Sequence, residues 1–212
     1  MPEKWHILEA QIVETKRFLD SAFTIKYLGH AKYFLGLEIA RSPDGMSITQ
    51  HKFIRDIIQD AGLISSKPAS TLLPLGVKLS SQDTSVLPDP EPYRRMVGRL
   101  LYLSFTRLDI SFGAQQLSQF VHRPCDTHMN ATLHLVRYLK GCFDQCLFFP
   151  SSTSFSITAY CDADWVGCVD SKRSLMGYCI FLGEALLEDE EANDGCSFYG
   201  GGRVQMFRLY SL

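Results

Sequence analysis

The sequence predicts an α+β fold in which a β-hairpin and one helix precede a helical middle and an incomplete mixed sheet. Three observations carry this prediction. A strong turn signal, Ser42-Pro-Asp-Gly45, separates two short strand-like runs. Apolar residues then recur at helical spacing through residues 52–61 and again from 93 to 140, and strand-like runs return after residue 145. A chain of 212 residues can bury one or two cores.

The first part of the chain alternates between helix and strand signals. Apolar spacing predicts a helix over residues 3–22 and a short strand over 24–28. Alternating apolar residues predict strands over 32–40 and 46–50, joined by the Ser42–Gly45 turn into a β-hairpin. An amphipathic helix is expected over 52–61, with Gly62 placed to end it in the left-handed conformation.

A Ser- and Pro-rich segment, residues 65–92, separates this part from the helical middle, and we interpret it as a long loop or as a domain linker. The expected helices after it are residues 93–105, 108–121 and 127–140. Asp126 or Thr127 can cap the last of them, and Gly141 can end it. The expected strands are residues 145–149, 155–161 and 177–182. No strand period continues after Gly183, where residues 184–194 hold six acidic side chains.

Composition restricts the classes of function. The formal net charge is −2, whereas a free-standing nucleic-acid-binding protein usually has a basic excess, so any contact with nucleic acid must come from local patches. No apolar run approaches the roughly 18 residues that span a membrane. The seven Cys lack a metal-ligand spacing, which favours reduced thiols in an intracellular protein, in the cytoplasm or the nucleus. We expect no membrane partner and no small-molecule ligand.

Two carboxylates stand at alternate positions near the end of a strand-like run. Asp162 and Asp164 leave the same face if the strand continues through them. Such a pair could contribute to a site for a hard cation such as Mg²⁺. The alternative is that both are solvated carboxylates at the end of a strand. The histidines at 128 and 134 are six residues apart, which does not suit a metal site on one helix face, and His128 is expected to cap or pack at the start of its helix.

Five landmarks occur in an order that resembles copia-type retrotransposon Pol polyproteins, which carry a reverse transcriptase and an RNase H. The first is Lys32-Tyr-Phe-Leu-Gly-Leu-Glu-Ile39, and the second is the block Met96-Val-Gly-Arg-Leu-Leu-Tyr-Leu103 with Thr106-Arg-Leu-Asp-Ile110. The other three are His128-Met-Asn-Ala131, Val136-Arg-Tyr-Leu-Lys-Gly141 and Ala159–Gly183. The resemblance covers roughly residues 8–183. Leu108 replaces the Pro of the family's Thr-Arg-Pro-Asp, and Met129 replaces an aromatic residue.

The resemblance implies a division of the chain. Residues 1–50 would be the C-terminal end of the reverse transcriptase palm with its β-hairpin, and 51–143 a thumb-like helical region. Residues 144–183 would be the truncated start of an RNase H-like sheet, and 184–212 a divergent tail. Asp162 matches the first metal-binding Asp of that RNase H, whose cofactor is Mg²⁺. No Mg²⁺ is expected to bind tightly here, because a single carboxylate pair holds this ion weakly.

The expected function is that of a catalytically inactive, truncated remnant of a reverse transcriptase with the beginning of RNase H. Polymerisation needs paired carboxylates that hold two metal ions. The family's adjacent Asp pair belongs upstream of Leu8, and no Asp-Asp occurs in this chain. A domesticated nucleic-acid-binding module and a residual Mg²⁺-dependent RNase H-like nuclease are the alternatives.

The implied partner is an RNA–DNA hybrid or a template–primer duplex. The expected phosphate-binding residues are Arg94, Arg95 and Arg99 on the first thumb helix and Arg137 and Lys140 on the last. Ordinary solubilising charge is the alternative for all five. The hairpin from Phe34 to Gln50 resembles the region that positions the primer terminus. Its alternative is a plain two-stranded element with Tyr33 and Phe34 in a core.

Overall fold

The computed structural model describes residues 3–26, 29–77, 79–81, 83, 85–152, 156–164, 175–183, 185–192 and 205–209. The backbone alone is described for residues 3–9, 161–164, 175–178, 187–192 and 205–209. The chain divides into two compact units, Met1–Lys32 and Tyr33–Leu212, and each is described by itself. None of the helices in the described ranges is both long enough and apolar enough to cross a membrane.

The first unit consists of helix α1, Glu3–Ala22, as the apolar spacing predicts. The strand expected over residues 24–28 is wrong for residues 24–26, and residues 27 and 28 lie outside the described residues. The backbone N–H of Phe23 donates to the carbonyl of Leu19 at 2.8 Å, so the chain continues the helical turn beyond α1.

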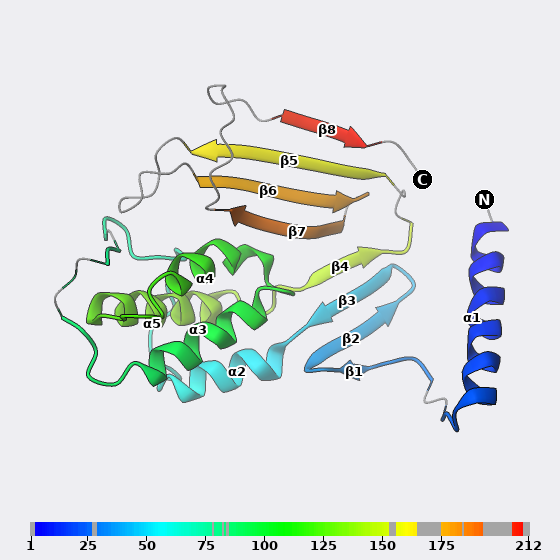
Figure 1. Ribbon diagram of the computed structural model, residues 1–212, viewed down its shortest axis with the longest axis horizontal. Coiled ribbons are helices and arrows are strands. Elements are labelled where there is room, and N and C mark those ends of the chain that lie inside the picture. Colours follow the sequence, from blue (N-terminus) through cyan, green and yellow to red (C-terminus); the bar gives the residue numbers. More distant parts are fainter. Residues whose placement is uncertain are drawn as a thin grey trace. The chain divides into compact units, whose positions relative to one another are not determined.

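The second unit opens with an antiparallel sheet whose strand order is β1-β2-β3-β4 (Figure 1). Its strands are β1 Tyr33–Phe34, β2 Leu37–Ser42, β3 Gly45–Thr49 and β4 Leu147–Pro150. The predicted turn is confirmed, since Ser42 pairs with Gly45 across a two-residue loop. The strand expected over 32–40 is interrupted, because Leu35 and Gly36 both adopt left-handed conformations, with φ of 49° and 81°. β4 returns from the far end of the helical region to complete this sheet.

Five helical segments follow β3 and form the main core. They are α2 His51–Asp60, α3 Glu91–Leu103, the 3-10 helix η1 Leu108–Ile110, α4 Ser111–Ser118 and α5 Asp126–Gly141. Their buried side chains make one hydrophobic cluster that includes Ile54, Ile57, Val97, Leu100, Leu117, Leu135 and Leu139. Gly62 follows α2 with φ 68° and ends it as predicted. The helix expected over 108–121 is instead a 3-10 turn followed by the shorter α4.

The start of α5 differs from the expected cap. Cys125 is the N-cap, and its backbone N–H donates to Nδ1 of His128 at 3.0 Å. Asp126 and Thr127 therefore do not cap the helix, and the Thr127 hydroxyl donates to Asp83 Oδ2 at 2.5 Å. The expectation that His128 acts at the helix start is confirmed. Its ring also stacks on Phe120, with centroids 4.0 Å apart.

The Pro-rich segment is a loop that packs on the helices, so the linker alternative is wrong. Leu72, Leu73 and Leu87 lie against the helical core. The loop is also held by backbone bonds, since the N–H of Ala69 donates to the carbonyl of Arg137 at 3.1 Å.

A second sheet has the order β7-β6-β5-β8 (Figure 1). Its strands are β5 Ile157–Asp164, β6 Leu175–Leu182, β7 Ala185–Ala192 and β8 Gln205–Leu209. All three pairings are antiparallel, so the expectation of a mixed sheet is wrong for the described strands. The expectation of no strand after Gly183 is also wrong. β7 and β8 are edge strands, which bond to one neighbour only, so a sequence without clear apolar alternation can form them.

Candidate nucleic-acid interface

One face of α3 lies away from the buried core. The helix begins with Glu91 and Pro92, which suit a helix N-terminus, and it buries Tyr93, Val97, Leu100 and Leu103. Residues three, four and seven apart share a helix face, so the face away from this core presents Arg95, Gly98, Arg99 and Tyr102. Phe105 follows the end of the helix and is 74% exposed. These five residues are called the α3 stripe.

Packing against the core does not explain why residue 98 of the stripe is a glycine. It lies in the middle of α3 and is exposed, and a Cβ added to it would meet nothing within 4 Å. A glycine inside a helix costs about 1 kcal/mol relative to alanine. Because no described neighbour requires the missing side chain, its effect is to leave the α3 backbone open between Arg95 and Tyr102. Sequence reasoning missed this residue, although a lone Gly inside a helical pattern was a signal.

Arg95 and Arg99 supply the positive charge of the stripe. Arg95 is exposed and makes no hydrogen bond or ion pair within the described residues. Arg99 is fixed in place, with Nη1 2.5 Å from Asp60 Oδ2 and its guanidinium carbon 5.3 Å from the centre of the Phe53 ring. Both arginines line a hollow of about 220 Å³ whose apolar walls include Met96, Met129 and Leu133.

The structure does not bring the other three basic residues onto the stripe. Arg94 Nη1 lies 2.7 Å from Glu91 Oε1, and its Nε donates to the carbonyl of Val121 at 2.9 Å. Lys140 Nζ donates to the carbonyls of Ile64 at 2.5 Å and Ser66 at 2.6 Å. Arg137 Nη2 donates to Nδ1 of His134 at 3.3 Å. The donors of these residues are thus directed to partners within the protein.

The β1–β2 turn presents a second exposed surface. Tyr33, Phe34 and Leu35 are 57%, 58% and 72% exposed, and these three residues are called the tip. The alternative that placed Tyr33 and Phe34 in a core is therefore wrong. The left-handed pair Leu35 and Gly36 gives the tight turn that suits two twisted antiparallel strands. Leu35 is the only described non-glycine residue with positive φ, a conformation that costs about 1–2 kcal/mol.

Tyr102 joins the tip to the stripe. Its hydroxyl donates to the carbonyl of Leu35, 67 residues away in the sequence. Its ring meets Phe53 edge-on, with centroids 5.3 Å apart, and Phe105 at 6.3 Å. Tip and stripe therefore meet at Tyr102, with the exposed aromatic residues near the tip and the two guanidinium groups farther along α3. Aromatic faces and cations in this combination suit the sugars, bases and phosphates of nucleic acid.

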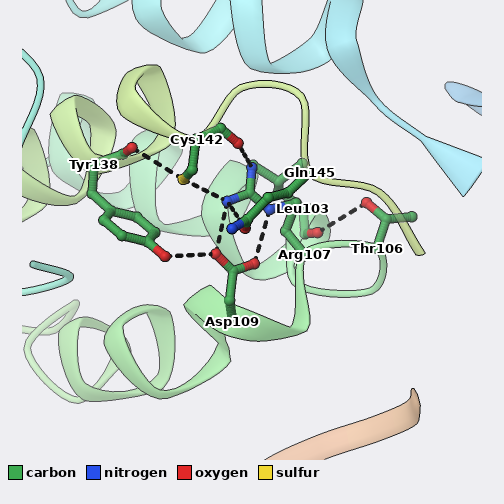
Figure 2. Close-up of polar contacts among 7 residues, drawn as sticks. All are labelled: Leu103, Thr106, Arg107, Asp109, Tyr138, Cys142 and Gln145. Carbon is green, nitrogen blue, oxygen red and sulfur yellow. Dashed lines mark hydrogen bonds and ion pairs between the residues drawn. The ribbon is translucent and has the colours of Figure 1, made fainter. Parts of the chain in front are cut away.

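Behind the stripe, a buried arginine connects the end of α3 to α5 (Figure 2). Arg107 is 2% exposed and grips both carboxylate oxygens of Asp109, with Nε and Nη2 at 2.8 and 2.7 Å. Its Nη1 donates to the carbonyl of Cys142 at 3.1 Å, and its Nη2 to Gln145 Oε1 at 3.1 Å. Burial alone would lower the pKa of Arg107, but the hydrogen bonds and charge of Asp109 outweigh it, so the pKa is raised. Arg107 is thus a structural cation within the Thr106–Ile110 landmark.

Tyr138 completes this cluster from α5. Its hydroxyl donates to Asp109 Oδ2 at 3.0 Å (Figure 2). Burial and the neighbouring Asp109 carboxylate raise the pKa of Tyr138. The cluster joins the segment from Arg107 through η1 to the end of α5.

Asp162 and Asp164 both lie in β5, where they pair with Gly177 and Leu175 of β6. The structure describes their backbone and not their side chains, so the metal-binding role of Asp162 stays a prediction. Within the described residues, no three His, Cys, Asp or Glu side chains are grouped as metal ligands.

Comparison with known proteins identifies relatives of this chain. The family model of reverse transcriptase (RNA-dependent DNA polymerase) matches residues 8–74. An uncharacterized mitochondrial protein of Arabidopsis thaliana is 39% identical over 165 residues, which cover 78% of this chain and 68% of the relative. The retrovirus-related Pol polyprotein from transposon RE2 of the same plant is 38% identical over 165 residues, covering 78% of this chain. The Pol polyprotein from transposon TNT 1-94 of Nicotiana tabacum is 31% identical over 185 residues, covering 82% of this chain.

The chain therefore belongs to the reverse transcriptase family of copia-type retrotransposon Pol polyproteins. It spans 11% of the RE2 polyprotein and 14% of the TNT 1-94 polyprotein. No solved structure matches it significantly.

Proposed function

We propose that this chain binds the template–primer duplex or RNA–DNA hybrid of a retrotransposon reverse transcriptase, and that it does so without catalysing polymerisation. The observation that carries this proposal is the joined surface of the tip and the α3 stripe. The family model is that of an RNA-dependent DNA polymerase, and the stripe combines an unpaired arginine with exposed aromatic rings within the unit Tyr33–Leu212. In this proposal residues 1–50 are the end of the palm, 51–143 the thumb, 144–183 the start of an RNase H-like sheet and 184–212 a divergent tail.

Gly98 favours a duplex over a single strand as the ligand. An A-form helix has a wide, shallow minor groove that shows its sugars and base edges to a protein. A helix can lie against that groove most closely where a residue lacks a side chain. Gly98 provides such a place, Arg95 on one side can reach a phosphate, and Tyr102 and Phe105 on the other can contact sugars.

Binding of the nucleic acid does not require that the chain also catalyses a reaction on it. Polymerisation requires carboxylates that hold two metal ions, and the sequence contains no adjacent Asp pair. We propose that Asp162 descends from an RNase H metal ligand and that Mg²⁺ does not bind tightly at it in this chain.

Hybrid binding to the full chain tests the proposal. Fluorescence anisotropy with a labelled RNA–DNA hybrid should show binding that weakens with salt, because contacts to phosphates release counterions. Arg95→Ala should weaken binding by about 1 kcal/mol or more and reduce the slope of log K against log salt by about one. Arg123→Ala is the matched control, because Arg123 is exposed but lies in the loop before α5, outside the stripe.

Three outcomes would contradict the proposal. No binding at micromolar concentrations in low salt would exclude a duplex-binding role for the chain. An equal loss of affinity in Arg95→Ala and Arg123→Ala would remove the stripe from the interface. Cleavage of the hybrid that needs Mg²⁺ and is abolished in Asp162→Asn would replace binding alone with the nuclease alternative.

A further inference from the structure

A buried amide lies beneath the tip and faces its turn. Gln50 stands between β3 and α2 and is 2% exposed. Its Oε1 accepts a hydrogen bond from the hydroxyl of Thr106 at 2.6 Å. Its Nε2 is buried and has no hydrogen-bond partner. A Cβ placed on Gly36 would lie 4.0 Å from this Nε2, so the unsatisfied amide lies next to the Leu35–Gly36 turn.

Further contacts tie the tip strands to the helices. The Tyr102 hydroxyl, which bonds the Leu35 carbonyl, would lie 3.6 Å from a Cβ placed on Gly36. Glu38, which pairs with Tyr33 across the β1–β2 turn, accepts the backbone N–H of Lys52 at the start of α2, at 2.9 Å. The turn and its strands are therefore contacted by Lys52 of α2, Tyr102 of α3 and Gln50 before α2. Two buried nitrogens beside them, Gln50 Nε2 and His51 Nε2, have no hydrogen-bond partner, and Gln50 Nε2 is the one next to the turn.

Resting on the proposed function, we propose that Gln50 and Thr106 are positioning residues that couple the tip to the α3 stripe, so that both surfaces bind one duplex as a unit. A buried amide donor without an acceptor is unfavourable, so a small movement of the turn toward Nε2 lowers the energy of that group. A duplex that presses on the tip moves the turn in this direction. Binding at the tip then stabilises the arrangement that presents the stripe, which is a differential interaction of the kind that couples two surfaces.

Thr106 offers a matched pair of variants. Thr106→Val keeps the shape of the side chain but removes the hydroxyl that anchors Gln50, whereas Thr106→Ser keeps the hydroxyl. Hybrid affinity of the full chain is measured for both variants, with the native tip and with Phe34→Ala/Leu35→Ala. Thr106→Val should weaken binding about fivefold with the native tip and less than about twofold with the altered tip, because contacting groups couple whereas independent ones do not. Thr106→Ser should bind within about twofold of the native chain in both backgrounds.

Hydrogen exchange without nucleic acid gives a second readout that does not depend on binding. Thr106→Val should speed exchange of the amides of residues 33–38, and leave the amides in the centre of α5 unchanged, because local opening is measured separately from global unfolding. Unchanged exchange at the tip, or an equal increase throughout the chain, would overturn the positioning role. Equal weakening of hybrid binding in both tip backgrounds would overturn the coupling. If the native chain binds no hybrid, the proposed function fails, while the exchange measurement still decides whether Gln50 and Thr106 position the tip.

Discussion

Tyr93 shows how the core fixes the charge state of a single residue. Its side chain is 0% exposed, and its hydroxyl donates to the carbonyl of Leu117 at 2.6 Å. Burial raises the pKa of Tyr93 well above its ordinary value of 10.0. The folded chain therefore keeps the proton of Tyr93 at a pH where the unfolded chain loses it.

Stability should fall at alkaline pH for this reason. Because the pKa of Tyr93 is higher in the folded chain than in the unfolded chain, its contribution to the free energy of unfolding is fully present below pH 10.0, the ordinary pKa of tyrosine. That contribution is lost as the pH rises above this value. We expect the free energy of unfolding in urea to decrease between pH 9 and 11 with a slope that approaches about 1.4 kcal/mol per pH unit for each such group. Tyr93→Phe should lower stability at pH 8 by about 1 kcal/mol, through the lost hydrogen bond, and should reduce the alkaline slope. An alkaline slope in Tyr93→Phe equal to that of the native chain would contradict the assignment.

The helix face on which a single residue lies could be predicted from the sequence, but its long-range contacts could not. Arg95 and Arg99 could be placed on the side of α3 away from the core, because the apolar residues of the helix recur on the other face. That Arg94 and Lys140 bond to distant carbonyls could not be predicted, because Lys140 and Ile64 are 76 residues apart and meet only in the fold. The structural role of Arg107 could not be predicted for the same reason, since its partner Cys142 is 35 residues away.

At the scale of elements, α3 and its neighbours follow from their apolar periodicity, which a buried helix face requires. The elements that could not be predicted from the sequence are those whose residues have only a weak local preference for that structure. The Leu35–Gly36 turn interrupts an apolar alternation that suits one continuous strand, because Tyr102 provides a tertiary contact for the turn. β7 and β8 lack strand alternation and form at the edges of a sheet whose inner strands are β5 and β6.

Alanine substitutions at two glycines that have room for a side chain should change the free energy of unfolding in opposite directions. Gly62 and Gly98 both have nothing within 4 Å of an added Cβ, but Gly62 has φ 68° whereas Gly98 is inside α3. Gly62→Ala should lower the free energy of unfolding by about 1 kcal/mol through left-handed strain. Gly98→Ala should raise it by about 0.5–1 kcal/mol, since alanine is the better helix residue.

Substitutions at the same two glycines should affect hybrid affinity and folding stability independently. Gly98→Leu should fold at least as well as the native chain and weaken hybrid binding, because the new side chain covers the open part of the stripe. Gly62→Ala should bind per folded molecule as the native chain does. A Gly98→Leu variant with native affinity would show that the ligand does not approach the α3 backbone, and would contradict the proposed docking.

At the scale of the whole molecule, a net charge of −2 means that no general attraction draws this chain to nucleic acid. Affinity must arise where arginines and aromatic rings are concentrated, and within the unit Tyr33–Leu212 that concentration lies on the tip and the α3 stripe. The packed loop before α3 and the buried cluster of Arg107 brace the helical core that carries α3. We therefore expect a local, salt-sensitive interface on a chain whose net charge is negative.

Hydroxyl-radical footprinting of the full chain, with and without an RNA–DNA hybrid, tests this claim most directly, because it locates the interface on side chains. Oxidation of Tyr33, Phe34, Leu35, Tyr102 and Phe105 should slow together when the hybrid is added. Ile64 and Leu75, which are 62% and 85% exposed and lie outside the surface, should oxidise at an unchanged rate. Hybrid binding that protects Ile64 or Leu75 and leaves the tip and the stripe unprotected would contradict the account.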